Sequence, residues 1–482
     1  METGGMETGD ISTQMLFIMI VWVAMVVIVV RSTMRSSAGT IGLPAAYLFA
    51  TTFLYIGAIT YIVPGYSQFA TGNLYLKSYD FTESTVIKGT LATLIGIAGF
   101  TIGTLLVRSG TNSWRSGEII TVGENYRRAL VLGLAGLGVT GFLLNMVHIT
   151  FPMKDVFLQV GRNAAVVVIC LGAVLAVRDG RGYKSWAMWA AVIPLTYLIV
   201  WGFVSYGFIV FTIFVGFWFS ILASRRLSRK KIAFSAFIIT YVLLSVFVGY
   251  MSFRAELREV IWGGAGYGER VSAIFNAFAN TKLLNPFDFE SLDWLNIRLN
   301  QYIFVGKAIE YHDQVPDLWL NGKSLLLSLI AWIPRVFWPG KPQMGGNHFV
   351  AEHTGMTFSD SATFGAGPVF EFYVNFGYVG IFIGFVVLGY ILRLIDARAS
   401  ISLRQGRLHS FARLFTVGIS IIAPLSEIFF VVSSAVASWL VIDAMARVIR
   451  TIVGDNGRSL PSNQSFLADD PRQSMPKAPP RQ

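Results

Sequence analysis

The sequence is poor in cysteine, histidine and charge. It has one cysteine and five histidines in 482 residues, and only 13% of its residues are charged. The lone Cys170 lies inside an apolar run, which excludes an intrachain disulfide and leaves no cysteine pair for a zinc site. Proteins that depend on a disulfide framework, on cysteine-bound zinc or on a highly charged soluble surface are therefore excluded.

Long apolar runs take the place of the missing charge, since 54% of the residues are hydrophobic. A helix needs about 20 apolar residues to cross a bilayer core of roughly 30 Å. The runs near this length predict an all-α, polytopic integral membrane protein with about eleven transmembrane helices. The predicted spans lie near 13–30, 41–63, 85–107, 129–151, 163–177, 185–202, 205–224, 232–251, 376–395, 412–426 and 428–446. The last two are short and meet at Pro424 and Glu427, so two spans, one bent span and a re-entrant pair all remain open.

Basic residues indicate how these helices are oriented. Cytoplasmic loops collect Lys and Arg, and 25 of the 38 Lys and Arg residues fall in alternate short loops and in the C-terminal tail. With the N-terminus outside, all of these stretches are cytoplasmic. The net charge of +11 then marks the side that faces anionic lipid, and no nucleic-acid partner is needed to explain it.

The same pattern divides the chain into four regions. We expect transmembrane helices one to eight in 1–251, a large, partly helical extracytoplasmic loop in 252–371, the C-terminal transmembrane helices in 372–446, and a disordered cytoplasmic tail in 447–482. The loop holds nine Lys and Arg residues against twelve Asp and Glu residues. It is therefore the region in which binding and catalytic groups are expected.

Apolar segments inside the loop predict that it packs on the membrane. Leu325–Trp338 is too short to span and is interrupted by Pro334, which is typical of a helix at the interface. Upstream, apolar residues recur every three or four positions. This spacing predicts one helix from a Ser291 cap to Tyr311, with Arg298 one turn from an aromatic residue on either side.

Ionisable residues gather in 332–380, between prolines, glycines and aromatic residues. His348 and His353 are five positions apart with Glu352 between them, which is no metal-ligand spacing, so we expect no metal. Arginine suits another task, because its guanidinium binds phosphate through two hydrogen bonds and keeps its charge. Arg335 stands out, since two prolines stiffen its surroundings and three aromatic side chains flank it.

Two segments of this region carry a resemblance. They read PRVFWPGKP at 334–342 and FEFYVNFGYVG at 370–380, where the second runs into a predicted span. Arg335 is followed by ten residues and then by Gly346. The segments resemble the O-antigen polymerases, which are the Wzy-type oligosaccharide repeat-unit polymerases, and that arginine–glycine spacing is described for the periplasmic loops of the family. The layout with many spans and one large, late loop extends the resemblance loosely to the whole chain.

This resemblance implies a GT-C-like glycosyltransferase in the bacterial inner membrane, with its active face in the periplasm. Such polymerases transfer a growing glycan from undecaprenyl pyrophosphate onto a sugar hydroxyl of an incoming lipid-linked repeat unit, and so make O-antigen for lipopolysaccharide or exopolysaccharide. They need no cofactor, nucleotide sugar or metal. The implied partners are undecaprenyl-pyrophosphate-linked oligosaccharide and membrane lipids, and a chain-length regulator is compatible with the resemblance.

The candidate residues divide into expected roles. Arg335 and Lys341 would neutralise the departing pyrophosphate, and Glu371 or one of the two loop histidines would orient or deprotonate the acceptor hydroxyl. Glu371 leads because it lies in a resembling segment at the membrane boundary, although the dipole of the following helix explains a carboxylate there equally well. The expected catalytic residues are Arg335, Glu371, His348 and His353, and the expected substrate-binding residues are Arg254, Arg298, Lys341, Trp338, Tyr373 and Asn375. Taken singly, Arg254 is better explained as a structural residue.

Two other functions remain open from the sequence. A glycan ligase would use the same lipid-linked donor with a different acceptor. A polysaccharide transporter would place ionisable residues at mid-membrane and show repeated half-bundles, whereas the predicted spans are nearly free of charge and no internal repeat is visible. We therefore expect a polymerase, with a ligase as the first alternative and a transporter as the second.

Overall fold

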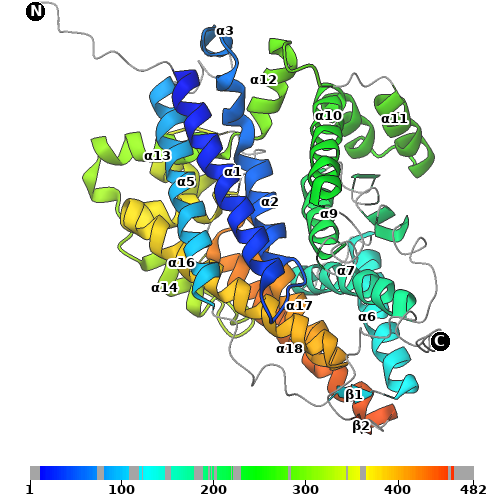
Figure 1. Cartoon of the computed structure of the whole chain (residues 1–482). Helices are drawn as coiled ribbons and strands as arrows, with labels where there is room; N and C mark the ends of the chain where they lie inside the picture. Colours follow the sequence, from blue (N-terminus) through cyan, green and yellow to red (C-terminus); the bar gives the residue numbers. More distant parts are fainter. Residues whose placement is uncertain are drawn as a thin grey trace, which may run out of the picture.

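Helices make up most of the structure, a computed structural model that describes residues 11–72, 81–107, 119–121, 123–146, 154–178, 188–190, 204–218, 229–279, 284–342, 346–358, 365–453 and 458–460, with isolated positions between 192 and 220. The helices are α1 Ile11–Arg35, α2 Leu43–Tyr55, η1 Ile56–Ile62, α3 Tyr66–Gly72, α5 Glu83–Leu106, α6 Glu124–Met146, α7 Lys154–Arg178, α9 Val204–Trp218, α10 Arg229–Trp262, α11 Tyr267–Ala279, α12 Phe289–Arg298, α13 Gln301–Gln314, η4 Pro316–Leu318, α14 Lys323–Leu329, α15 Gly346–Thr354, α16 Gly367–Arg404, α17 Leu408–Ile421 and α18 Ile428–Val453. Two short strands, β1 Ile119–Thr121 and β2 Arg458–Leu460, pair antiparallel. Figure 1 shows the arrangement.

Seven of the described helical segments are long and apolar enough to cross a membrane. They are α1, α5, α6, α7, α16, α18 and the continuous α2–η1 segment Leu43–Ile62. Each coincides with a span predicted from the sequence. The chain is therefore a helical membrane protein, which confirms the class that composition predicts.

The other four predicted spans differ from these seven. The helices α9 and α17 are apolar but have only 15 and 14 residues. The span near 232–251 lies within α10, whose 34 residues continue into a charged C-terminal third. The span near 185–202 falls mostly outside the described residues. Since α17 and α18 are separate helices joined by 422–427, one bent span is excluded there; the total of eleven stays a prediction.

Glycines allow α5 to approach two neighbouring helices closely. A Cβ atom built on Gly103 would lie 2.1 Å from the Val386 carbonyl oxygen of α16, and one on Gly89 would lie 1.9 Å from the Tyr302 carbonyl oxygen of α13. Such small residues let helix backbones pack tightly, as is common between membrane helices. The contact joins α13, which belongs to the predicted outer loop, to the transmembrane bundle.

One end of the bundle gathers loops that the sequence predicts to be cytoplasmic. The Asp396 carboxylate near the C-terminal end of α16 accepts hydrogen bonds from the backbone N–H groups of Ile41 at 3.0 Å and Leu43 at 3.2 Å. Arg393 pairs with Asp396 and donates to the Gly39 carbonyl oxygen at 2.8 Å. We call this the basic end, because two of the Lys- and Arg-rich loops of the sequence prediction, 31–40 and 396–411, meet here.

The opposite end gathers segments of the predicted outer loop. The Gly57 N–H of η1 donates to the Leu299 carbonyl oxygen at 2.9 Å. The Thr85 hydroxyl of α5 donates to the Glu310 carboxylate of α13 at 2.9 Å. We call this the loop end.

The single helix predicted from Ser291 to Tyr311 is wrong. The structure has α12 and α13 instead, separated at Leu299 and Asn300, and the α12 N-cap is Asp288, whose side chain accepts from the Ser291 N–H at 3.2 Å. The break lets the Leu299 carbonyl oxygen meet η1, a tertiary contact that periodicity alone does not reveal.

The remainder of the predicted outer loop is also partly helical, as expected. The short helix α14 packs on α16 and α18, and α15 packs on α13. Large apolar side chains of the 325–338 segment are exposed, including Leu326 and Leu329 at 67% each and Phe337 at 80%. This exposure agrees with the predicted position of the segment at a membrane interface.

Candidate active site at the start of helix α18

The long helix α16 carries Glu371 into the protein interior. Its backbone leaves helical geometry at Phe376 and Gly377, and Gly377 has φ 61°, a conformation that favours glycine. This kink separates an initial segment, which includes Glu371 and Asn375, from the long apolar part that follows. The initial segment is covered by neighbouring helices, and both of these side chains are 1% exposed.

The Glu371 carboxylate joins three helices. Its Oε1 accepts from the Ser324 hydroxyl of α14 at 2.9 Å, and its Oε2 accepts from the Ile428 backbone N–H of α18 at 2.6 Å. The first N–H groups of a helix have no partner within the helix and carry a partial positive charge, so a carboxylate there is stabilising. Glu371 therefore caps α18. The sequence suggested that it interacts with the dipole of its own helix, but its carboxylate bonds instead to the start of another helix.

Asn375 lies one turn after Glu371 and completes the same hydrogen-bond network. Its Nδ2 donates to the Ser324 hydroxyl at 2.8 Å and to the Glu371 carbonyl oxygen at 2.7 Å, while its Oδ1 accepts from the Gly322 N–H at 3.0 Å. We refer to Ser324, Glu371 and Asn375 as the Glu371 network. Every member is buried, so the network holds α14 against α16 and α18 in one geometry.

A second buried carboxylate lies in the turn between α17 and α18. The Glu427 Oε1 atom accepts from the backbone N–H groups of Gly346 at 3.1 Å and Ala366 at 3.2 Å. Its burial raises the pKa of the carboxyl group above its usual range. Glu427 thus ties the starts of α15 and α16 to the start of α18, beside Glu371.

Lys341 and Arg335 lie in the turns that follow α14. The Lys341 ammonium donates to the carbonyl oxygens of Ala331 and, at 3.2 Å, Ile333, and it lies 4.9 Å from the ring centre of Phe429. Desolvation, together with the nearby positive charge of Arg335, lowers the pKa of Lys341. Arg335 donates to the Lys341 carbonyl oxygen at 2.7 Å, and its side chain is exposed. Lys341 therefore contacts the start of α18 directly, and Arg335 is linked to it through its hydrogen bond to Lys341.

The two candidate histidines lie in different environments. His348 is exposed on α15, whereas His353 is 1% exposed and its Nδ1 lies 3.1 Å from the Nε2 of His312 on α13. Burial, and next the neighbouring histidine, lower the pKa of His353 to about 4, and burial also lowers the pKa of His312. His353 and His312 are consequently a neutral pair that joins α13 to α15, and His348 is the accessible histidine.

The candidate aromatic residues are divided between the interior and the surface. Tyr373 is 3% exposed, and its ring centre lies 5.5 Å from that of Trp319 and 5.8 Å from that of His312. Trp338 is half-buried within the consecutive turns of 334–341. Of the two aromatic residues expected to bind substrate, Trp338 is thus nearer the surface, and Tyr373 belongs to the packing around the histidine pair.

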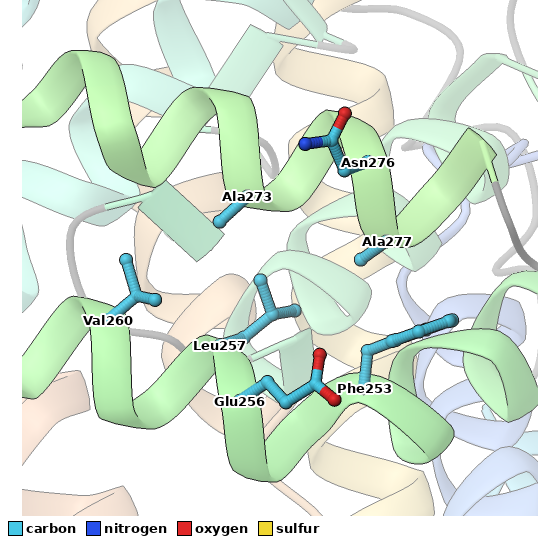
Figure 2. A pocket seen from close by; sticks show the side chains of 7 residues that line it. All are labelled: Phe253, Glu256, Leu257, Val260, Ala273, Asn276 and Ala277. Carbon is cyan, nitrogen blue, oxygen red and sulfur yellow. The ribbon is translucent and has the colours of Figure 1, made fainter.

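Two arginines expected to bind substrate lie on other helices. Arg254 is on α10, which stands on the opposite side of the view from α14 in Figure 1, and Arg298 ends α12. A pocket of about 240 Å³ lies between α10 and α11 (Figure 2). Its lining is Phe253, Glu256, Leu257, Val260, Ala273, Asn276 and Ala277, so it includes neither arginine. The described residues therefore bring Arg335 and Lys341 together with Glu371 and Asn375 at the start of α18, whereas Arg254 lies on α10 and Arg298 on α12.

Sequence reasoning missed two residues of this site and one of the histidine pair. The hydroxyl of Ser324 donates to Glu371, and Glu427 accepts from the backbone N–H of Ala366 at the start of α16. His312 is the partner of His353. Glu427 had a signal, because it is a carboxylate inside an apolar stretch, but the sequence indicates only a turn. In the part of the chain that the structure describes, no group of three His, Cys, Asp or Glu side chains is placed to hold a metal ion.

Comparisons with known proteins gave one match. Residues 43–403 match a family described as a domain of unknown function (DUF8712). The matched range runs from the start of α2 to near the end of α16 and includes both segments that resemble the polymerases. No curated protein matches the chain, and no solved structure does.

Proposed function

Because the chain belongs to the DUF8712 family, whose description assigns no function, we propose a function from its own residues: polymerisation of undecaprenyl-pyrophosphate-linked oligosaccharide repeat units. The reaction takes place at the periplasmic face of the bacterial inner membrane. Its product is an O-antigen or an exopolysaccharide, still attached to the lipid carrier. The enzyme is a glycosyltransferase that needs no nucleotide sugar.

One observation carries this proposal. The two segments that resemble the polymerases, 334–342 and 370–380, are separated by 27 residues along the chain, yet both contact the first residues of α18. Glu371 accepts from the Ile428 N–H at 2.6 Å, and Lys341 lies 4.9 Å from the ring centre of Phe429, the next residue. Arg335 is tied to the same point by its hydrogen bond to Lys341. Two separate segments that meet at one point are expected if both contribute to the same active site.

The charges around that point suit a pyrophosphate. The Arg335 guanidinium and the Lys341 ammonium donate to backbone carbonyl oxygens, which are neutral, so their positive charges are not cancelled by those bonds. Fixed cations in partly desolvated surroundings stabilise charge that develops on a leaving group. Exposed Trp332, Val336 and Phe337 flank the arginine and are suited to the polyprenyl chain and the bilayer.

The proposed step has a simple balance. The acceptor hydroxyl oxygen forms a bond to the anomeric carbon of the donor sugar, while the bond from that carbon to the pyrophosphate oxygen breaks. The bonding electrons leave with undecaprenyl pyrophosphate, whose charge Arg335 and Lys341 meet. The hydroxyl proton passes to a general base. Beyond the donor and the acceptor, no redox partner or further reactant is needed.

Exposure favours His348 as that base. Glu371 and His353 are each 1% exposed, and both oxygens of Glu371 already accept hydrogen bonds from Ser324 and Ile428. His348 is exposed and lies two residues after Gly346, whose N–H is bonded to Glu427. We therefore assign Glu371 a positioning role, in which it fixes α14 and α18 around the cations, and give the proton transfer to His348.

Purified protein and lipid-linked repeat units test the proposal directly. With no nucleotide sugar and with EDTA present, the protein is expected to make a ladder of longer lipid-linked oligosaccharides, because a single substrate serves as donor and acceptor. A product that forms only after lipid A or an acceptor protein is added would replace the polymerase with a ligase. A strict need for divalent metal would contradict charge stabilisation by Arg335 and Lys341.

Two variants separate the proposed roles within the same assay. His348→Gln removes the base and is expected to slow the ladder about 100-fold, a magnitude typical of general-base loss, with unchanged substrate binding. Glu371→Gln keeps the shape of the side chain but disturbs the α18 cap, so it should slow the ladder and also lower the melting temperature. A normal rate for His348→Gln would remove this histidine from the chemistry.

A further inference from the structure

A second cluster of charged side chains lies toward the basic end of α17 and α18. On α18, the Asp443 carboxylate is met by Arg413 Nη1 of α17 at 2.7 Å and by Arg447 Nη2 at 2.6 Å. His409 Nε2 lies 3.3 Å from the same carboxylate. The Asp443 side chain is only 8% exposed, whereas that of Arg447 is 76% exposed. The cluster is therefore anchored inside the protein and opens outward at Arg447.

Positive charge exceeds negative charge in this cluster. Two arginines, Arg413 and Arg447, pair with the single carboxylate of Asp443. A third, Arg450, lies one turn beyond Arg447 and interacts electrostatically with His409. In addition, the Arg413 Nε atom is buried and has no hydrogen-bond partner within the described protein. An arginine that pairs with one carboxylate through Nη1 keeps further N–H donors in a fixed fork. The cluster thus has both the charge and the donors to bind one more anion.

Its surroundings are those of a lipid-facing surface. The Arg413 guanidinium lies 5.7 Å from the ring centre of Trp439, which is 43% exposed. On the same helix Leu440 is 49% exposed and Val448 is 57% exposed. Because α18 is long and apolar enough to cross the membrane, exposed apolar side chains on it face acyl chains. An anion held here has apolar groups on one side and cations on the other.

We propose that Arg413, Arg447 and Arg450 bind the phosphate of an anionic phospholipid in the leaflet at the basic end. Arginine recognises phosphate through paired hydrogen bonds, and basic residues between membrane helices bind anionic head groups. The acyl chains lie along the exposed face of α18 marked by Leu440 and Val448. This site lies at the opposite end of α18 from Glu371 and is independent of the proposed polymerase reaction.

Native mass spectrometry of the delipidated, full-length protein tests this site. We would titrate phosphatidylglycerol, or phosphatidylcholine with the same acyl chains, and count the bound lipid. Phosphatidylglycerol is expected to bind at least about tenfold more tightly, since it carries a net charge and phosphatidylcholine does not. Arg447→Gln is expected to weaken phosphatidylglycerol binding about tenfold, as the loss of one charge-assisted hydrogen bond predicts.

Matched controls keep the result interpretable. Arg447→Gln leaves Asp443 paired with Arg413, so the fold is retained, and an unchanged melting temperature verifies this. Arg398→Gln removes an exposed arginine of α16 at the same end and should leave lipid binding unchanged. Equal binding of the two lipids, or equal losses for the two variants, would overturn the proposal. Displacement of the lipid by glycerol 3-phosphate alone would instead identify a site for soluble anions.

Discussion

The two ends of the helical bundle hold their buried carboxylates in different ways. At the basic end, Asp396 pairs with Arg393, and Asp443 pairs with Arg413. At the loop end, the donors to Glu371 and Glu427 are backbone N–H groups and the Ser324 hydroxyl. Among the residues that the structure describes, neither of these two glutamates forms an ion pair.

This difference separates charge that holds helices together from charge that the proposed substrate can use. A buried carboxylate that is neutralised by arginine holds two segments together. Removing one partner of such a pair strongly destabilises the fold, because the other charge is left buried and unpaired. At the loop end the glutamates cap helix starts without using the nearby cations. Arg335 and Lys341 are held by carbonyl oxygens, so their charges remain for a substrate anion.

A topology measurement tests most completely whether the two ends of the bundle face opposite sides of the membrane, because each reporter gives an all-or-none result. A reporter fused after Asn300 is expected to be extracytoplasmic, and one fused after Arg229 is expected to be cytoplasmic. The reason is the uneven distribution of Lys and Arg along the chain. If both reporters lie on the same side, the two ends do not face opposite compartments, and the assignment of the active face is lost with them.

Removal of a structural ion pair is the next largest effect. Asp396→Ala leaves Arg393 buried, at 2% exposure, without its carboxylate, and it removes two backbone hydrogen bonds to the α2 start. We expect a loss of about 3–5 kcal/mol in the free energy of unfolding, seen as aggregation in detergent or a lower melting temperature. The matched control is Asp313→Ala, whose side chain is 63% exposed and pairs with Lys88, and which should cost less than about 1 kcal/mol. Equal effects of the two substitutions would show that burial is not what matters.

A smaller effect is expected from the histidine pair as pH falls. The pKa of His353 is about 4, below the ordinary value of 6.5, so the unfolded chain binds more protons between these values. The stability contributed by the neutral ring is therefore complete above about pH 6.5 and is lost as pH falls toward 4. His353→Gln should flatten the fall in melting temperature over this range, whereas His348→Gln, at an exposed site on the same helix, should not. Parallel curves for His353→Gln and the wild type would assign the acid sensitivity to other groups.

Sequence pattern predicts the membrane class well, because this class follows from local composition. Hydropathy located seven of the helices correctly, since a run of apolar residues as long as α5 has few other structures available. It failed between Ser291 and Tyr311, where the chain breaks so that the Leu299 carbonyl oxygen can meet the N–H of Gly57. That contact is 242 positions distant along the chain and leaves no local signal.

The candidate site shows the same limit. Arg335, Lys341 and Glu371 could be named from the sequence because they lie in short, polar, proline- and aromatic-rich segments. The roles of Glu371 and His353 could not, since burial and tertiary partners decide them. Ser324 was not predicted at all, because a serine in an apolar helix has no sequence feature that identifies its partner.

The most direct test of the account compares one arginine from each end in the ladder assay. Arg335→Ala should reduce the rate about 100-fold with an unchanged melting temperature, because the side chain is exposed and donates to a single carbonyl oxygen. Arg335→Lys should recover little, since a point charge does not reproduce the guanidinium fork. Arg413→Ala should lower the melting temperature and leave the rate per folded molecule unchanged. A near-normal rate for Arg335→Ala, or a loss of rate confined to Arg413→Ala, would contradict the central claim that the cations at the loop end act on the substrate.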